Sequence, residues 1–167
     1  MRFEIRSYEP VWEEEILDLS MRAWAPVFPM LERVTPRYVY DAFYPDGWEA
    51  RQKADIGDFL RNEGSSVWVA EADGKVLGFI GLRTHSEDSM GEVYLLAVDP
   101  DHQRHGVATA LMQFSMMHFS AAGMKIAMVE TGGDPGHAGA RKTYESFGFR
   151  RWPVARYFCD VETKRSE

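Results

Sequence analysis

The sequence predicts an α+β (mixed α/β) fold in which helices cover both faces of a central mixed, mostly antiparallel sheet. Two features lead to this prediction: three strands in a meander are expected over residues 66–98, and a helix–strand–helix–strand series follows over residues 106–161. A meander supplies antiparallel neighbours, whereas a strand–helix–strand connection supplies a parallel pair. The chain has 167 residues, 45% of them hydrophobic, and no internal linker, so a single domain over residues 1–167 is expected.

The N-terminal third is expected to hold one strand followed by helices. Residues 2–7 alternate polar and apolar side chains, which is the pattern of a strand with one buried face. Pro10 suits the first turn of a helix, and the glutamates at 13–15 then lie near its positive end. Pro26 ends this helix. Residues 48–62 are expected to form another helix.

The middle of the chain is expected to form the meander. Residues 66–72 and 75–85 read as two strands around Asp73-Gly74, a dipeptide that tolerates the positive φ of a tight hairpin turn. The third strand, 91–98, is apolar on both faces over its second half, which is typical of a central strand. After it we expect a helix over 106–122, a strand over 125–131, a helix over 137–147 and a last strand over 156–161.

Charge and composition argue against several classes of protein. The net charge of -7 argues against nucleic-acid binding, which usually needs a basic surface, and is compatible with a cationic acceptor. The single cysteine, Cys159, cannot form an intrachain disulfide, so a reducing, cytoplasmic location is expected. Residues 1–11 do not resemble a secretory signal. The most apolar stretch, 107–124, is interrupted by Gln113 and His118, so we expect a buried helix there and no membrane span.

A strand-to-helix turn over 99–109 is the strongest sign of a ligand site. The first amides of a helix lack backbone acceptors and the helix dipole makes that end positive, so such a turn favours an anion. Gly106 and Ala108 have almost no side chain, which lets a phosphate approach the backbone, and Arg104 and His105 add positive charge. The pattern fits neither a Walker loop nor a dinucleotide fingerprint. By itself the turn is equally well explained as a helix start with an exposed arginine.

Two motifs resemble the GNAT superfamily of acyl-CoA-dependent N-acetyltransferases. Residues 93–100, Val-Tyr-Leu-Leu-Ala-Val-Asp-Pro, followed by Gln103-x-x-Gly106-x-Ala108, look like motif A of that family. Residues 140–149 look like its motif B, which usually reads Ala-x-x-x-Tyr-x-x-x-Gly-Phe. The two motifs stand in the family's order and at a plausible separation.

The resemblance implies acetyl-CoA as co-substrate and divides the chain by role. Residues 66–161 form the implied acetyl-CoA-binding core, while residues 1–65 match only in layout and form the variable acceptor side. The sheet is implied to be splayed between its fourth and fifth strands, with the pantetheine arm along the open strand and the amide near Val98 polarising the acetyl carbonyl. His137 stands where the family often has an asparagine that contacts the coenzyme. The residues implied to bind the coenzyme are Leu96, Ala97, Val98, Gln103, Arg104, His105, Gly106, Val107, Ala108, Thr109, His137, Ala140 and Tyr144.

Two side chains are expected to move protons. Tyr144 is the expected acid, because a phenol, with a pKa of about 10, can protonate a thiolate whose thiol has a pKa of about 8.5. The alternative is a core tyrosine packed with Phe147. Glu92 is the expected base, at the start of the central strand where several family members have a glutamate; a solvated carboxylate is an equal alternative. Regular alternation would place Glu92 on the same side as Tyr94 and Leu96.

The implied reaction moves the acetyl group to a primary amine of a small molecule or peptide by direct attack in a ternary complex. The sequence leaves open a non-catalytic acyl-CoA-binding module, another acyl donor and a hydroxyl acceptor. His102 and His105 have a spacing that suits a metal, but without a carboxylate or cysteine cluster beside them we expect no metal. Members of the family often form homodimers, but the sequence leaves the oligomeric state open. Most aromatic residues of the acceptor side are expected to pack helices on the sheet, namely Trp24, Phe28, Tyr38, Tyr40, Tyr44 and Trp48.

Overall fold

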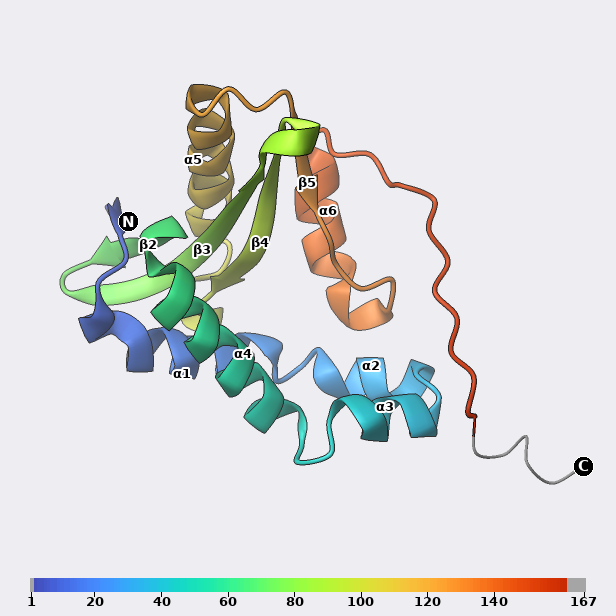
Figure 1. Cartoon of the computed structure of the whole chain (residues 1–167). Helices are drawn as coiled ribbons and strands as arrows, with labels where there is room; N and C mark the ends of the chain where they lie inside the picture. Colours follow the sequence, from blue (N-terminus) through green and yellow to red (C-terminus); the bar gives the residue numbers. More distant parts are fainter. Residues whose placement is uncertain (1, 162–167) are drawn as a thin grey trace, which may run out of the picture.

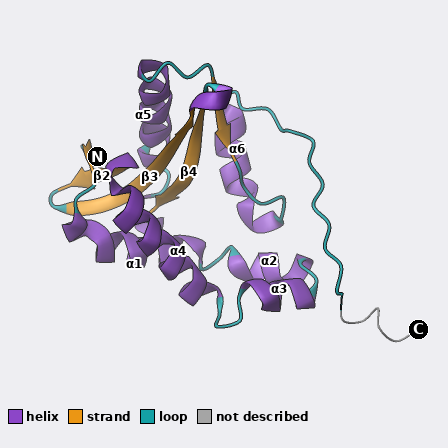
Figure 2. Cartoon of the chain, viewed as in Figure 1, coloured by secondary structure: helices purple, strands orange, loops and turns teal. Residues whose placement is uncertain are grey.

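The structure is a computed structural model that describes residues 2–161, and these residues form one five-stranded sheet with flanking helices (Figures 1 and 2). The strands are β1 (Glu4–Ser7), β2 (Val67–Ala72), β3 (Lys75–His85), β4 (Met90–Val98) and β5 (Ile126–Val129). The α-helices are α1 (Glu13–Trp24), α2 (Phe28–Val34), α3 (Arg37–Phe43), α4 (Trp48–Glu63), α5 (Val107–Ala121) and α6 (Ala138–Ser146). Short 3-10 helices are η1 (Pro10–Trp12), η2 (Gly64–Ser66), η3 (Ser86–Asp88), η4 (Pro100–His102) and η5 (Pro135–His137).

The strands lie side by side in chain order, from β1 to β5. Every neighbouring pair is antiparallel except β4 and β5, which are parallel and are joined by α5. The β2–β3 hairpin turns at Asp73 and Gly74, whose φ values of 51° and 79° give the left-handed backbone expected there. The expectation of a mixed, mostly antiparallel sheet is therefore confirmed.

Different helices cover the two faces of the sheet, and the strands alternate between them. Phe79 of β3 packs into a core with Ile16 of α1 and Ile56 of α4. Ile80, the next residue of β3, packs into the opposite core with Leu111 of α5. All of these side chains are almost fully buried, and burying each stabilises the fold by roughly 1.5–3 kcal/mol. None of the described helices is long and apolar enough to cross a membrane.

The aromatic residues between α1 and α4 mainly pack against one another. The ring of Phe28 stacks on Trp48 at a centroid distance of 4.3 Å and meets Tyr44 edge-on at 5.4 Å. Tyr40 lies 4.8 Å from Tyr44 by the same measure, and both Phe28 and Tyr40 are buried. These rings therefore pack the short helices and the start of α4 against one another, whereas the sequence analysis expected most of them to pack helices on the sheet. Helix α2 also contacts η5, which precedes α6.

The strand predicted over Arg156–Val161 is wrong. Residues 149–160 form no helix or strand, and the segment runs away from the sheet (Figure 1). Its large apolar side chains are mostly exposed, for example 84% for Trp152 and 89% for Tyr157. The segment contacts the body through Phe158, whose carbonyl oxygen accepts a hydrogen bond from the Tyr38 hydroxyl. Apolar composition alone suggested a strand, but a strand also needs a neighbouring edge for its backbone hydrogen bonds.

Candidate active site

The central strand β4 contains a bulge that the sequence does not reveal. Gly81 of β3 lies opposite Leu95, yet Leu82 lies opposite Val93, so Tyr94 is the extra residue. The Tyr94 ring packs on Phe59 of α4 at 4.8 Å. Leu95 also packs into the core beneath α1 and α4. After this extra residue, the side chains of β4 again alternate between the two faces of the sheet, but shifted by one position.

The bulge corrects the predicted arrangement of side chains along β4. Leu96 packs into the α5 core, on the face of the sheet opposite to Tyr94. Glu92, two residues before Tyr94, lies on the α4 face, where it is the cross-strand neighbour of Arg83. Leu96 therefore does not share a side with Glu92, because one extra residue exchanges the faces of everything that follows it.

The bulge also marks the point where β4 and β5 separate. Their pairing covers only Met90–Val93 and Ile126–Val129, so within residues 2–161 the rest of β4 has an open edge on this side. The Asp99 N–H donates to the carbonyl oxygen of Leu77 in β3. Alternation then directs the backbone groups of Leu96 and Val98 toward the open edge. The sheet is splayed between its fourth and fifth strands, as expected.

The turn from β4 to α5 presents a row of free backbone donors. In the part of the chain that the structure describes, no acceptor takes the six N–H groups of residues 104–109, and the first α5 amide with a partner is that of Ala110, which donates to Gly106. Arg104 and Gly106 have φ values of 65° and 83°. No atom lies within 4 Å of the position that a Cβ of Gly106 would take. Together with the dipole of α5, these donors form an open, positive concavity that suits an anion.

The side chains along this turn divide between contact with the core and exposure. Val107 is buried and Ala108 packs against the α5 core, so these two can offer a ligand only backbone groups. Arg104, His105 and Thr109 are exposed. The Gln103 side-chain amide donates to the carbonyl oxygen of Val98 at 3.3 Å and closes the turn onto the end of β4.

An ion pair fixes the start of the turn to α1. The Arg22 guanidinium donates to both carboxylate oxygens of Asp99, at 2.8 and 2.7 Å, and the Asp101 N–H also donates to Asp99. Burial by itself would raise the pKa of Asp99, but these hydrogen bonds and the charges of Arg22 and His102 outweigh it and lower the pKa. Sequence analysis missed the Arg22 contact, because the two residues are 77 positions apart.

Glu92 has a partner that the sequence did not suggest. Its Oε2 lies 2.7 Å from Nε2 of His85, near the end of β3. Arg83, opposite Glu92 in the ladder, instead donates to both oxygens of Glu63 and stacks 3.5 Å above the Tyr94 ring. The ladder pairs His85 with Met90 and Arg83 with Glu92, so the contact of His85 with Glu92 runs diagonally across the two strands and is not indicated by the sequence.

Tyr144 lies on α6, half-buried at the margin of the α5 core. Its ring meets Phe149 edge-on at a centroid distance of 6.3 Å, and burial raises the pKa of its phenol. Ala140, one turn earlier, is half-buried on the same helix. No described contact joins Tyr144 to Glu92, which faces the α4 side of the sheet. The structure thus places these two predicted proton carriers on separate elements.

His137 is held by a carboxylate that the sequence analysis overlooked. Its Nδ1 lies 2.6 Å from Oδ2 of the buried Asp134, whose Oδ1 accepts from the Gly136 N–H. Burial alone would raise the pKa of Asp134, but the hydrogen bond and charge of His137, with the backbone donors, lower it. Arg141 donates to the carbonyl oxygens of Gly132 and Asp134 and stiffens the loop further. Nε2 of His137 is left to contact a ligand.

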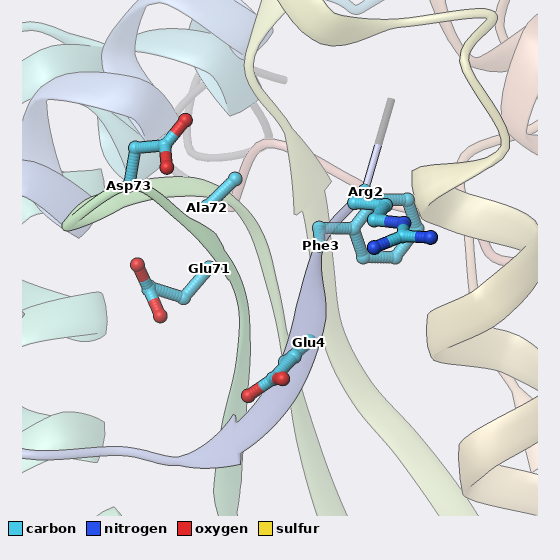
Figure 3. Close-up of a pocket in the computed structure, with 6 residues that line it drawn as sticks. All are labelled: Arg2, Phe3, Glu4, Glu71, Ala72 and Asp73. Atoms are coloured by element: carbon cyan, nitrogen blue, oxygen red, sulfur yellow. The ribbon is translucent and has the colours of Figure 1, made fainter.

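A separate hollow lies at the other edge of the sheet, between β1 and the β2–β3 turn (Figure 3). Figure 3 shows three carboxylates around it, together with the Arg2 side chain. It contains none of the predicted site residues; its lining consists of Arg2, Phe3, Glu4, Glu71, Ala72 and Asp73. Among residues 2–161 there is no group of three or more His, Cys, Asp or Glu side chains that could hold a metal ion.

Comparison with known proteins identifies the class to which this fold and turn belong. The model of the acetyltransferase (GNAT) family matches residues 8–149. The chain therefore belongs to the GNAT family of acetyltransferases. The PaiA N-acetyltransferase of Thermoplasma acidophilum, solved in complex with coenzyme A, has a similar fold, with a TM-score of 0.61 and 16% identity over 87% of this chain and 89% of that one.

Curated relatives match part of the chain more closely in sequence. N-acetylaspartate synthetase of Rattus norvegicus is 34% identical over 111 residues, which are 63% of this chain and 35% of the relative. Mycothiol acetyltransferase of Streptomyces coelicolor is 35% identical over 85 residues, 51% of this chain and 27% of the relative. The matched region thus spans about a third of these relatives.

Proposed function

We propose that this protein is an N-acetyltransferase that moves the acetyl group of acetyl-CoA to a primary amine of a small molecule or peptide. The observation that carries the proposal is the row of six free N–H groups at residues 104–109, directly beyond the open edge of β4. The family match and the coenzyme A complex of the PaiA neighbour support the choice of coenzyme. The names of the two curated relatives, a synthetase of N-acetylaspartate and an acetyltransferase, support acetylation of nitrogen.

The residues present fit the phosphates and the pantetheine arm of the coenzyme. The amides of residues 104–109 are positioned to donate to the pyrophosphate, and the exposed Arg104 adds a positive charge. Both backbone groups of Leu96 and the Val98 N–H face the open edge of β4 and can pair with the amides of the arm, as an added strand would, while the Val98 carbonyl oxygen accepts from Gln103. His137 and Ala140 on the neighbouring loop and helix complete the proposed coenzyme site.

In this proposal, groups of the protein polarise the acetyl carbonyl and transfer the protons. When bound, acetyl-CoA supplies an acetyl group activated as a thioester. We assign the Val98 N–H to polarising the carbonyl, because it points to the open edge of β4. Glu92 receives the proton of the arriving ammonium, and Tyr144 protonates the departing sulfur. Burial raises the pKa of Tyr144, so the phenol carries its proton at neutral pH.

Direct attack in a ternary complex follows from this assignment, because no cysteine lies in the proposed site to hold an acyl intermediate. The only cysteine of the sequence, Cys159, lies in the extended C-terminal segment. The net charge of -7 favours the approach of a cationic amine. With a single cysteine and no intrachain disulfide, we place the protein in a reducing compartment such as the cytoplasm.

Calorimetry with coenzyme A and an assay of thiol release together test the proposal. We expect binding of coenzyme A and release of thiol from acetyl-CoA with at least one member of an amine panel. Tyr144→Phe should lower kcat by roughly 10²–10⁴-fold with coenzyme A affinity unchanged. Binding without turnover on amines or alcohols would instead identify a non-catalytic module, and the absence of binding would refute the assignment altogether.

A further inference from the structure

Glu92 of β4 and His85 of β3 form a hydrogen-bonded pair on the α4 face of the sheet. The two side chains meet at 2.7 Å, and Glu92 is the more buried, with 15% of its side chain exposed against 31% for His85. The second ring nitrogen of His85, Nδ1, lies 3.9 Å from Oε1 of Glu87, too far for a hydrogen bond. His85 therefore touches Glu92 with one nitrogen and keeps the other available.

The neighbouring cation does not neutralise Glu92. Arg83 lies opposite Glu92 in the β3–β4 ladder, but both of its bidentate hydrogen bonds go to Glu63 of α4, at 2.9 and 2.6 Å. The planar guanidinium group of Arg83 also stacks on the ring of Tyr94. The group in contact with Glu92 is consequently an imidazole, which can take up and release a proton near neutral pH, and not a permanent cation.

We propose that His85 is a positioning and proton-relay residue that completes the base through Glu92; this inference rests on the proposed N-acetyltransferase function. The acceptor arrives as an ammonium and gives one proton to Glu92, which passes it to His85 and then to water. The neutral amine attacks the acetyl carbon, the new C–N bond replaces the C–S bond, and the second nitrogen proton balances the thiol formed with the help of Tyr144. One proton is released to solvent per acetyl group transferred.

A pair of residues is useful because the pKa of a carboxyl group lies far below that of an ammonium. A carboxylate is a weak base toward an amine whose pKa is about 10, and general-base catalysis works best when the accepting group titrates near the working pH. In this arrangement Glu92 takes the proton from the amine, and His85 gives that proton a second acceptor on the way to water. The charged groups facing His85 are Glu92 on β4 and Glu87 on η3, while Arg83 of its own strand is paired with Glu63.

The test compares pH profiles of kcat/KM for the amine in the wild type, His85→Asn and His85→Gln. We expect kcat/KM at pH 7 to fall roughly 10–100-fold in both variants, and their pH profiles to differ in shape from that of the wild type. Coenzyme A affinity by calorimetry and KM for acetyl-CoA should stay within about twofold, because His85 is outside the proposed coenzyme site. The double variant His85→Asn with Glu92→Gln should lose little more kcat/KM than Glu92→Gln alone, since the two residues act as one unit.

Glu87→Gln is the matched control, because it removes a carboxylate near His85 that forms no hydrogen bond with it; kcat/KM at pH 7 should stay within about twofold of the wild type. If the wild type acetylates an amine and both His85 variants share its profile, the inference is wrong and the proposed function stands. If the wild type acetylates nothing, the proposed function fails and the inference falls with it. A loss of coenzyme A binding in both His85 variants would show a structural role and also overturn the relay.

Discussion

Replacing Arg22 with methionine tests whether α1 holds the start of the anion-binding turn. The substitution removes both hydrogen bonds to Asp99, whose side chain is 9% exposed, while that of Arg22 is 50% exposed. Removing one partner of a fully buried pair costs about 3–5 kcal/mol, and an exposed pair contributes about 0–1 kcal/mol. Because solvent screens the arginine side of this pair, we expect a loss of about 1–2 kcal/mol.

For a domain of this size, each kcal/mol corresponds to a shift of about 2–4 °C in Tm, so the loss of about 1–2 kcal/mol should lower the Tm of Arg22→Met by roughly 2–8 °C. Coenzyme A should bind about fivefold more weakly, because Asp99 fixes the first residues of the turn. Circular dichroism melting and titration calorimetry at pH 7 measure the two effects. Arg22→Lys should recover only part of each, since lysine lacks the bidentate fork.

Arg51→Met provides the control for this prediction. It breaks the exposed i,i+4 pair with Asp55 on α4, which lies outside the turn, so Tm should change by less than about 1 °C and coenzyme A affinity should not change. The reasoning would be refuted if Arg22→Met and Arg51→Met were indistinguishable from each other in both assays.

Three further predictions concern packing, the turn and acid. Gly91→Ala should destabilise the protein by about 1–3 kcal/mol in urea unfolding, because its Cβ would lie 2.3 Å from ring atoms of Phe119; an unchanged midpoint would contradict the close packing of α5 on β4. Gly106→Ala should lower the free energy of unfolding by about 1–2 kcal/mol, because alanine disfavours the φ of 83° even though its Cβ meets no neighbouring atom. It should also lower the affinity for coenzyme A in calorimetry, and an unchanged affinity would argue against phosphate contact at this residue. The folded state lowers the pKa of Asp99 and Asp134, so near those pKa values it binds fewer protons than the unfolded chain and stability rises with pH. Their contribution should be complete above about pH 4–5 and be lost as the pH falls below about 4 through their folded pKa values, and Asp99→Asn should flatten this acid dependence of the urea midpoint.

Features of the candidate site could be predicted where they depend on residues that are close together in the sequence. Gly106 and Ala108 indicated a turn whose backbone a ligand can approach, and the structure shows free N–H groups at the same residues. The β2–β3 hairpin followed from Asp73-Gly74, since that dipeptide accepts the backbone angles of the turn. These signals depend on residues a few positions apart.

Other parts of the site depend on register and distant packing. The partnership of His85 with Glu92 requires knowing how β3 and β4 align across η3, and which diagonal neighbour Glu92 contacts. The expected last strand failed for a related reason, because the apolar residues around Tyr157 say nothing about whether an edge is available to pair with them.

The sequence by itself determined the order of the strands β1–β5 and of the helices α1, α4, α5 and α6, the hairpin, the start of α5 and the family, because backbone sterics, side-chain periodicity and short motifs act over a few residues. Only the tertiary structure decided which faces β4 presents after Tyr94, that Arg22 holds Asp99, and that His85 meets Glu92. These contacts join residues 7 to 77 positions apart or depend on a single extra residue in a strand. A one-residue shift exchanges the two faces of a sheet, so they are fixed by the packing of the whole chain and not by any local pattern.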